Sequence, residues 1–227
     1  MTLANRKVSS SRQLTKKSAT KVEFDFVLKK LKKHYPYAHC ALHFTNPFEL
    51  LVATILSAQC TDERVNKVTP HLFEAYPDSF SMSEAPVEEI EEIIKSTGFF
   101  RNKARNIKMC AQELVEKYKG EVPQTLEELH ALPGVGRKTA NVVLGNAFGI
   151  ASGVVVDTHV TRLSNRFGWV KMTDAVKIEM KLNKMCPQKD WIMLSHYLIA
   201  HGREICVARS PKCDICFLQE ACPKRGV

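Results

Sequence analysis

Apolar side chains recur at helical spacing along much of the chain. In residues 87–98, VEEIEEIIKSTG, apolar positions follow one another at intervals of three to four residues, with acidic residues on the opposite face. This period predicts an amphipathic surface helix, and Gly98 stands where a left-handed C-terminal cap is wanted. Residues 102–120 repeat the scheme and also end in glycine. Both segments therefore predict helices that bury one face.

A nearly continuous apolar run occupies residues 46–59, NPFELLVATILSAQ. Asn46 is a preferred N-cap residue, and Pro47 fits the first helical position because its missing N–H would be unpaired there anyway. The run that follows leaves no polar face for solvent. We therefore predict a buried central helix.

Five further segments combine apolar periodicity with helix-starting or helix-ending residues. They are residues 125–132, 137–148, 158–167, 174–185 and 191–206. Only residues 153–156, GVVV, have the character of a strand, and so short a run cannot build a sheet. The prediction is an all-α fold.

Two features divide the chain. Glycine and serine mark a joint at residues 149–153, and cysteines gather near the C-terminal end, which together suggest two lobes rather than a single bundle. Residues 1–20 hold five basic side chains and no acid. This composition predicts a disordered basic tail, with an auxiliary DNA-binding arm as the alternative.

Charge narrows the class of partner. Lysine and arginine number 33 against 24 acidic residues, and the resulting net charge of +9 favours a polyanion such as nucleic acid, or an anionic membrane surface. No apolar run approaches the length of a membrane span, and the N-terminus lacks the apolar core of a secretory signal. We therefore expect a cytoplasmic protein with no membrane partner.

Four of the eight cysteines cluster at the C-terminus. Thiols in a reducing compartment rarely form disulfides, so clustered cysteines indicate metal binding. The cluster consists of Cys206, Cys213, Cys216 and Cys222. Structural zinc sites are commonly built from two close pairs, whereas here one close pair lies between two more distant cysteines. An iron–sulfur cluster is favoured on spacing, and zinc stays open as the alternative.

The segment LPGVG, residues 132–136, separates two predicted helices and indicates a helix-hairpin-helix. We expect Gly134 and Gly136 to permit a backbone turn too tight for side chains, with exposed amides that grip a phosphate. Arg137 begins the second helix of the hairpin. Turn chemistry alone also explains such a sequence, but apolar helices on both sides and a basic chain favour contact with a DNA backbone.

Lys138 and Asp157 are the candidate catalytic pair. The positive end of the helix dipole disfavours an ammonium at Lys138, and a neutral amine there can attack a sugar C1′. A phosphate contact is the alternative role. Asp157 follows a buried apolar run directly onto a helix start, where it suits an N-cap and equally a fixed catalytic carboxylate. His159 and His201 are expected to serve as hydrogen-bonding residues.

Four ordered motifs resemble the endonuclease III family of helix-hairpin-helix DNA glycosylases. They are SAQCTDERVNK, LPGVGRKTANVVL, VDTHV and the cysteine spacing, and the likeness runs from about Phe24 to the end of the chain. The resemblance implies a six-helix barrel at residues 43–152, with the hairpin at about 124–146. It also implies an iron–sulfur domain made of residues 21–42 and 153–227, and a DNA cleft between the two.

The resemblance also assigns roles to residues. It implies that Lys138 is the nucleophile, Asp157 the catalytic aspartate, and Gln59 the residue that fills the gap left by a flipped nucleotide. Phe99 takes the place of a wedge that we expect to be aliphatic in bacterial relatives. The four clustered cysteines would hold a [4Fe–4S] cluster.

The loop between the first two clustered cysteines, residues 207–212, is a second candidate contact with DNA. It carries Arg209 and Lys212, which would bind phosphates. A lysine that the resemblance leads us to expect in this loop is replaced by Ser210.

The function that follows is a bifunctional DNA glycosylase and AP lyase of base excision repair. Lys138 would displace an oxidised pyrimidine from duplex DNA through a Schiff base and nick the strand by β-elimination. The partner is double-stranded DNA with damaged pyrimidines or abasic sites, bound by a monomer associated with a bacterial-type nucleoid. Two alternatives are a monofunctional adenine glycosylase, which lacks the lysine, and a non-catalytic DNA-binding protein with a metal cluster.

Overall fold

The computed structural model describes residues 22–227, so the predicted tail at residues 1–20 lies outside the described residues. Within 22–227 there are eleven α-helices and no strand, which confirms the all-α prediction. The helices are α1 (Phe24–His34), α2 (Pro47–Leu56), α3 (Asp62–Ala75), α4 (Ser79–Glu84), α5 (Val87–Ile94), α6 (Phe100–Tyr118), α7 (Leu126–Ala131), α8 (Arg137–Phe148), α9 (Thr158–Arg166), α10 (Ala175–Met185) and α11 (Trp191–Glu204). Three 3₁₀ turns cover Lys95–Thr97, Gln188–Asp190 and Cys213–Ile215.

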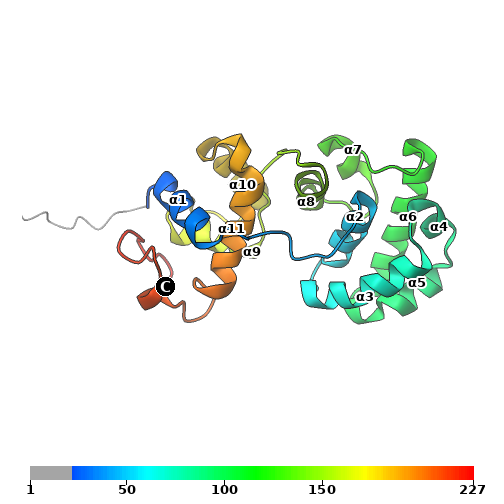
Figure 1. The fold of residues 1–227 in the computed structure, drawn as a ribbon, viewed down its shortest axis with the longest axis horizontal. Coiled ribbons are helices and arrows are strands. Elements are labelled where there is room, and N and C mark those ends of the chain that lie inside the picture. The colour runs from blue at the N-terminus through cyan, green and yellow to red at the C-terminus, as the bar shows by residue number, and fades with distance from the viewer. Residues whose placement is uncertain (1–21) are drawn as a thin grey trace, which may run out of the picture.

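The helices form two lobes, each around its own apolar core (Figure 1). The barrel lobe contains α2 to α8, and its core gathers side chains between Leu42 and Leu144. The cluster lobe contains α1, α9, α10, α11 and the C-terminal segment. The N-terminal helix α1 thus leaves its sequence neighbours and packs against α11 at the other end of the chain.

Helix α2 lies at the centre of the barrel lobe, as its composition predicts. The Asn46 side chain caps it by accepting a hydrogen bond from the Glu49 amide at 2.9 Å, and Pro47 occupies the first helical turn. Residues 48 and 50–56 are all buried, and α2 packs against α3, α6 and α8. The buried helix therefore orders the helices around it.

Helix α5 is shorter than its sequence pattern predicts. It ends at Ile94, and a 3₁₀ turn carries the chain to Thr97. Gly98 then takes a positive φ of 70°, and Phe99, which is not a glycine, follows with φ 47°. The chain reverses here into α6, so the loop 98–99 projects from the barrel lobe.

Contacts between side chains join the two lobes. Arg137 at the start of α8 donates two hydrogen bonds of 2.9 Å to the buried carboxylate of Glu179 on α10. Arg203 on α11 pairs with Asp62 on α3 at 2.6 Å. Because paired hydrogen bonds between an arginine fork and a carboxylate fix direction as well as distance, the Arg137 contact sets where α8 lies against the cluster lobe.

The hairpin between α7 and α8 corrects one prediction. Gly134 has φ 76°, and a Cβ on it would lie 2.8 Å from Cβ of Asn106, so this position requires glycine. Gly136 has φ −81°, and a Cβ there would meet nothing within 4 Å. The expectation that Gly136 is needed for a tight turn was wrong. What its missing side chain leaves is open space in front of the α8 N-terminus.

The two glycines should therefore respond differently to alanine. Gly134→Ala forces a side chain into a left-handed conformation, which costs about 1–2 kcal/mol, and places it against Asn106. We expect a lower midpoint of thermal unfolding for Gly134→Ala and a nearly unchanged midpoint for Gly136→Ala, both measured by circular dichroism. Equal midpoints for the two variants would contradict this account of the turn.

Candidate active site

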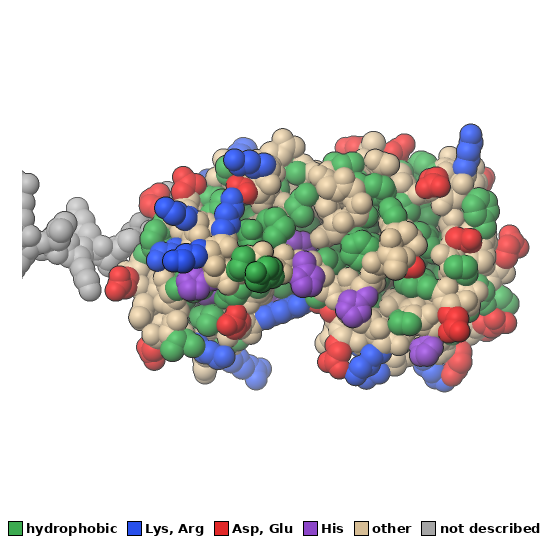
Figure 2. Space-filling model, viewed as in Figure 1, with side chains coloured by type: hydrophobic (Ala, Val, Ile, Leu, Met, Phe, Trp, Pro, Cys, Tyr) green, Lys and Arg blue, Asp and Glu red, His purple; other side chains and the backbone are tan. Residues whose placement is uncertain are grey.

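A pocket of about 120 Å³ lies where the two lobes meet. Figure 2 shows a notch in the surface between the two lobes. On this face, Lys and Arg side chains are more frequent over the cluster lobe. The pocket is lined from both sides by polar side chains: Ser57, Lys138, Asn141 and Asn146 from the barrel lobe, and Asp157, His196 and Arg203 from the cluster lobe. Neither lobe alone provides this set.

Lys138 and Asp157, the pair singled out in the sequence, both line this pocket. Lys138 belongs to the first turn of α8, where Gly136 provides no side-chain cap. Asp157 is the N-cap of α9, and its Oδ1 accepts a hydrogen bond from the Val160 amide at 2.8 Å. Two helix starts therefore bring an amine and a carboxylate to one cavity.

The carboxylate of Asp157 is held ionised by its neighbours. Burial on its own raises the pKa of the Asp157 carboxyl, since its side chain is only 17 % exposed. Hydrogen bonds from His159 Nδ1, at 2.9 Å from Oδ2, and from the Val160 amide outweigh burial, and the charge of Lys138 acts in the same direction. The net effect places the pKa of Asp157 below its ordinary value. Lys138 and Asp157 face the same pocket.

The N-cap interpretation of Asp157 is confirmed, and its catalytic role stays a prediction. Its carboxylate caps α9, and the same carboxylate lines the pocket with Lys138. His159, expected to be a hydrogen-bonding residue, donates from Nδ1 to Oδ2 of Asp157, because an ionised carboxylate can only accept. The two oxygens have different partners, since Oδ1 faces Val160 and Oδ2 faces His159.

Gln59 and Phe99 lie on separate loops of the barrel lobe. Gln59 follows α2, is exposed and has φ 52°. Phe99 follows the 3₁₀ turn after α5, has φ 47° and is 66 % exposed. A left-handed backbone at a residue other than glycine costs of order 1–3 kcal/mol, and such residues gather at functional sites. Their roles at DNA stay predictions.

The remaining predicted DNA contacts have mixed surroundings. The guanidinium of Arg137 is already engaged by Glu179, which gives this residue a role between the lobes that the sequence did not reveal. Arg209 and Lys212 are both exposed in the loop between Cys206 and Cys213. Contact of these three side chains with phosphate stays a prediction.

Sequence reasoning missed three buried charged residues, Lys103, Arg166 and Glu179. Glu179 is 4 % exposed and lies beside Ile178 on the buried face of the otherwise basic helix α10. An acidic residue on the apolar face of a helix can be recognised in the sequence as a candidate buried charge. Its partner Arg137, 42 residues earlier, cannot be identified in that way. Lys103 falls on the buried face of α6, where a lysine is out of pattern.

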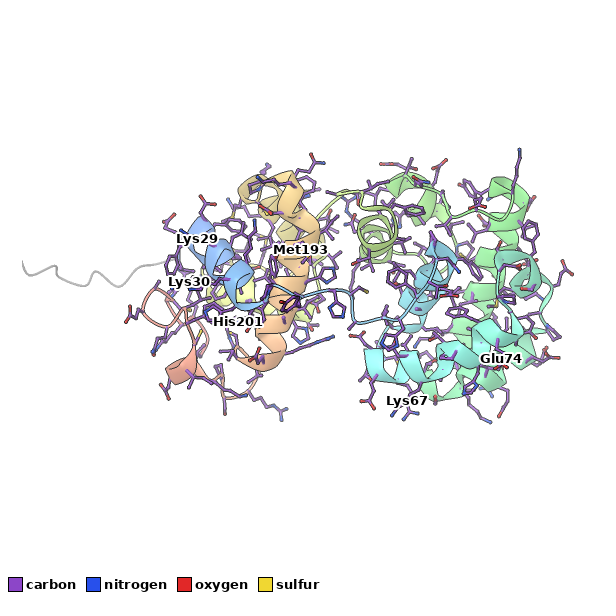
Figure 3. The ribbon with its side chains drawn as sticks, in the orientation of Figure 1. Lys29, Lys30, Lys67, Glu74, Met193 and His201 are labelled. Carbon is purple, nitrogen blue, oxygen red and sulfur yellow. The ribbon has the colours of Figure 1, made fainter. Side chains whose placement is uncertain are left out.

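The four C-terminal cysteines line a single small pocket beside Arg166 and His201. Arg166 Nη1 lies 3.3 Å from Sγ of Cys206, and the Lys224 amide lies 3.4 Å from Sγ of Cys222. Nε2 of His201, which Figure 3 labels in the cluster lobe, lies 3.7 Å from Sγ of Cys216. Hydrogen-bond donors directed at cysteine sulfurs are a common surrounding of iron–sulfur thiolates.

The arrangement of these sulfurs also bears on zinc. In the part of the chain that the structure describes, no three Cys, His, Asp or Glu side chains converge closely enough to hold one metal ion. The four cysteines around one pocket provide the thiolate set that a [4Fe–4S] cluster takes.

Comparisons with known proteins agree with this site. Residues 52–188 match the HhH-GPD superfamily of base excision DNA repair proteins, and residues 206–222 match the iron–sulfur binding domain of endonuclease III. The chain is 56 % identical to an endonuclease III of Synechocystis over 92 % of its length and 96 % of that protein. It is 46 % identical to an endonuclease III of Bacillus subtilis, over 88 % of this chain and 91 % of the relative.

Solved structures give the same result. A trapped covalent intermediate of an endonuclease III with DNA superimposes with a TM-score of 0.84 at 48 % identity, covering 87 % of this chain and 93 % of that one.

No helix among residues 22–227 is both long and apolar enough to cross a membrane. The iron–sulfur prediction is confirmed by the match over the four cysteines. The chain belongs to the endonuclease III family, and it is a base excision repair enzyme with DNA glycosylase and AP lyase activity.

Proposed function

We propose that Lys138 is the nucleophile and Asp157 its acidic partner in the removal of oxidised pyrimidines from duplex DNA. One observation carries this proposal: both side chains line the same pocket between the lobes, close enough for the lysine charge to lower the pKa of the carboxyl. Lys138 is also exposed to solvent, so a substrate can reach its amine.

The chemistry needs both groups. The Lys138 amine forms a bond to C1′ of the sugar while the glycosidic C–N bond breaks, and the base leaves with that electron pair and takes up a proton. Asp157 accepts a proton from the lysine and stabilises positive charge that develops on the sugar. Ring opening then gives a Schiff base. Loss of the C2′ proton expels the 3′ phosphate by β-elimination and leaves a nicked strand.

The damaged nucleotide has to leave the helix to reach this pocket, because a base inside the stack is out of reach. Gln59 fills the vacated space and Phe99 enters beside it as an aromatic wedge. The α8 N-terminus, with open space at Gly136, binds a backbone phosphate, and Arg209 and Lys212 bind others. A relative solved as a covalent complex with DNA supports this arrangement.

The two lobes act as the two sides of the DNA cleft. The barrel domain comprises residues 43–152, and the cluster domain comprises 21–42 and 153–227. The two separate apolar cores support this division except at Leu42, which packs in the barrel core. The enzyme acts as a monomer on duplex DNA with damaged pyrimidines or abasic sites, associated with the nucleoid. Cys206, Cys213, Cys216 and Cys222 hold the [4Fe–4S] cluster, which fixes the loop that carries Arg209 and Lys212. Neither base removal nor elimination needs an electron from it.

Lys138→Ala tests the nucleophile. With duplex DNA containing an oxidised pyrimidine and borohydride, the wild type should yield a covalent adduct, whereas the variant should lose trapping and nicking by about 1,000-fold or more. Lys117→Ala is a matched control, because Lys117 forms only an exposed ion pair with Glu113. A wild type that neither traps nor nicks any lesion would leave a non-catalytic DNA-binding protein as the function.

His159→Ala tests the acidic partner through pH. The hydrogen bond from His159 is the strongest of the influences that lower the pKa of Asp157, so its loss should raise that pKa. A group with a lowered pKa stays ionised to lower pH, and raising the pKa makes the carboxylate protonate sooner as pH falls. The acid limb of the kcat/KM profile should therefore move to higher pH. His159→Gln, which keeps a donor, should shift it less; an unmoved limb in both variants would rule out this role.

A further inference from the structure

Lys103 is a buried lysine whose ammonium donates hydrogen bonds to backbone carbonyls. It belongs to α6, is 5 % exposed, and its Nζ donates hydrogen bonds of 2.8 Å to the carbonyl oxygens of Leu56 and Thr97. Burial lowers the pKa of Lys103, and the neighbouring thiol of Cys60 opposes this effect. Keeping a charge inside a protein is costly, so a lysine in this position calls for an explanation.

The two carbonyls belong to the ends of two helices. Leu56 is the last residue of α2, and Thr97 is the last residue of the 3₁₀ turn that continues α5. Carbonyls in the final turn of a helix lack partners within the helix, and the helix dipole places negative charge there. The Lys103 ammonium therefore satisfies two helix ends at once and holds them at a fixed distance from each other.

The chain beyond each of these ends carries a residue with left-handed backbone. Three residues after Leu56 comes Gln59, with φ 52°, and two residues after Thr97 comes Phe99, with φ 47°. The backbone amide of Lys103 also donates to the Phe99 carbonyl at 3.1 Å. That backbone bond is the first of α6, whereas the Lys103 side chain bonds to the residue that ends the helix before each exposed loop.

We propose that Lys103 is a positioning residue that fixes the Gln59 loop and the Phe99 loop relative to each other, so that both side chains enter duplex DNA together. The proposal rests on the proposed function, in which these two side chains open the duplex. Lys103 itself is buried under the loops and touches neither DNA nor the reacting atoms. Its effect must therefore be confined to substrates whose nucleotide has to be extracted from a helix.

Lys103→Met separates positioning from chemistry. Methionine has a similar length and no donor, so the carbonyls of Leu56 and Thr97 lose their bond while the volume is kept. Single-turnover excision from duplex DNA with an oxidised pyrimidine should fall about 10- to 100-fold, as expected when a supporting contact shifts geometry by about an ångström. Borohydride trapping on single-stranded DNA with an abasic site needs no duplex opening and should stay within about 3-fold of wild type.

Two controls sharpen this comparison. Lys117→Met removes an exposed lysine from the same helix and should match wild type on both substrates. Phe99→Ala should lower duplex excision, and adding Lys103→Met to it should lower it little further, because both act through the same loop. Folding is verified by circular dichroism. If Lys103→Met does not fold, Lys103→Gln, which retains amide donors, replaces it and should show a smaller loss of the same kind.

The outcomes distinguish this inference from the function on which it rests. If the wild type forms a covalent adduct with neither substrate, the proposed function and the role of Lys103 are both overturned. Wild-type trapping with unchanged duplex excision in the Lys103 variant, an equal loss on both substrates, or full additivity with Phe99→Ala overturns the role of Lys103 alone. A loss limited to duplex DNA and shared with Phe99→Ala supports it.

Discussion

The structure depends on a carboxylate held at the start of one helix opposite an amine at the start of another. Asp157 caps α9 through the Val160 amide, and Lys138 lies in the first turn of α8 on the other side of the pocket between the lobes. The two residues belong to different lobes. The proposed chemistry therefore requires that the two lobes keep their relative position.

The contacts between the lobes maintain that position. Arg137 precedes Lys138 in the chain, and its paired hydrogen bonds to Glu179 hold the α8 N-terminus against α10. A Cβ on Gly153 would lie 2.3 Å from the Glu179 carboxylate, so the joint before α9 needs a glycine for this pair to form. Across the pocket, the Asn146 and His196 side chains meet at 2.8 Å. Arg137, which was expected to bind DNA, thus holds the start of α8, where Lys138 lies.

Much of the fold follows from local chemistry that the sequence displays. The Asn46 cap and Pro47 start α2 as expected, and the predicted segment 137–148 matches α8 residue for residue. The family resemblance and the cysteine spacing predict the iron–sulfur cofactor from the sequence alone. The Gly136 expectation failed because the motif does not show which of its glycines has a close neighbour: Asn106 lies against Gly134, whereas a Cβ on Gly136 would meet nothing within 4 Å. Lys103 and Glu179 were missed because their partners are distant in sequence, and a single sequence does not show which distant residues meet. That Lys138 and Asp157 share a pocket is likewise a product of tertiary packing.

The most direct measurement is to map the covalent bond itself. The borohydride-reduced adduct of the wild-type enzyme with an oxidised-pyrimidine duplex can be digested and its peptides sequenced by mass spectrometry. The account predicts that the mass of the sugar remnant is found on the peptide containing Lys138, at that side chain. A remnant on another lysine or on the N-terminal amine would contradict it.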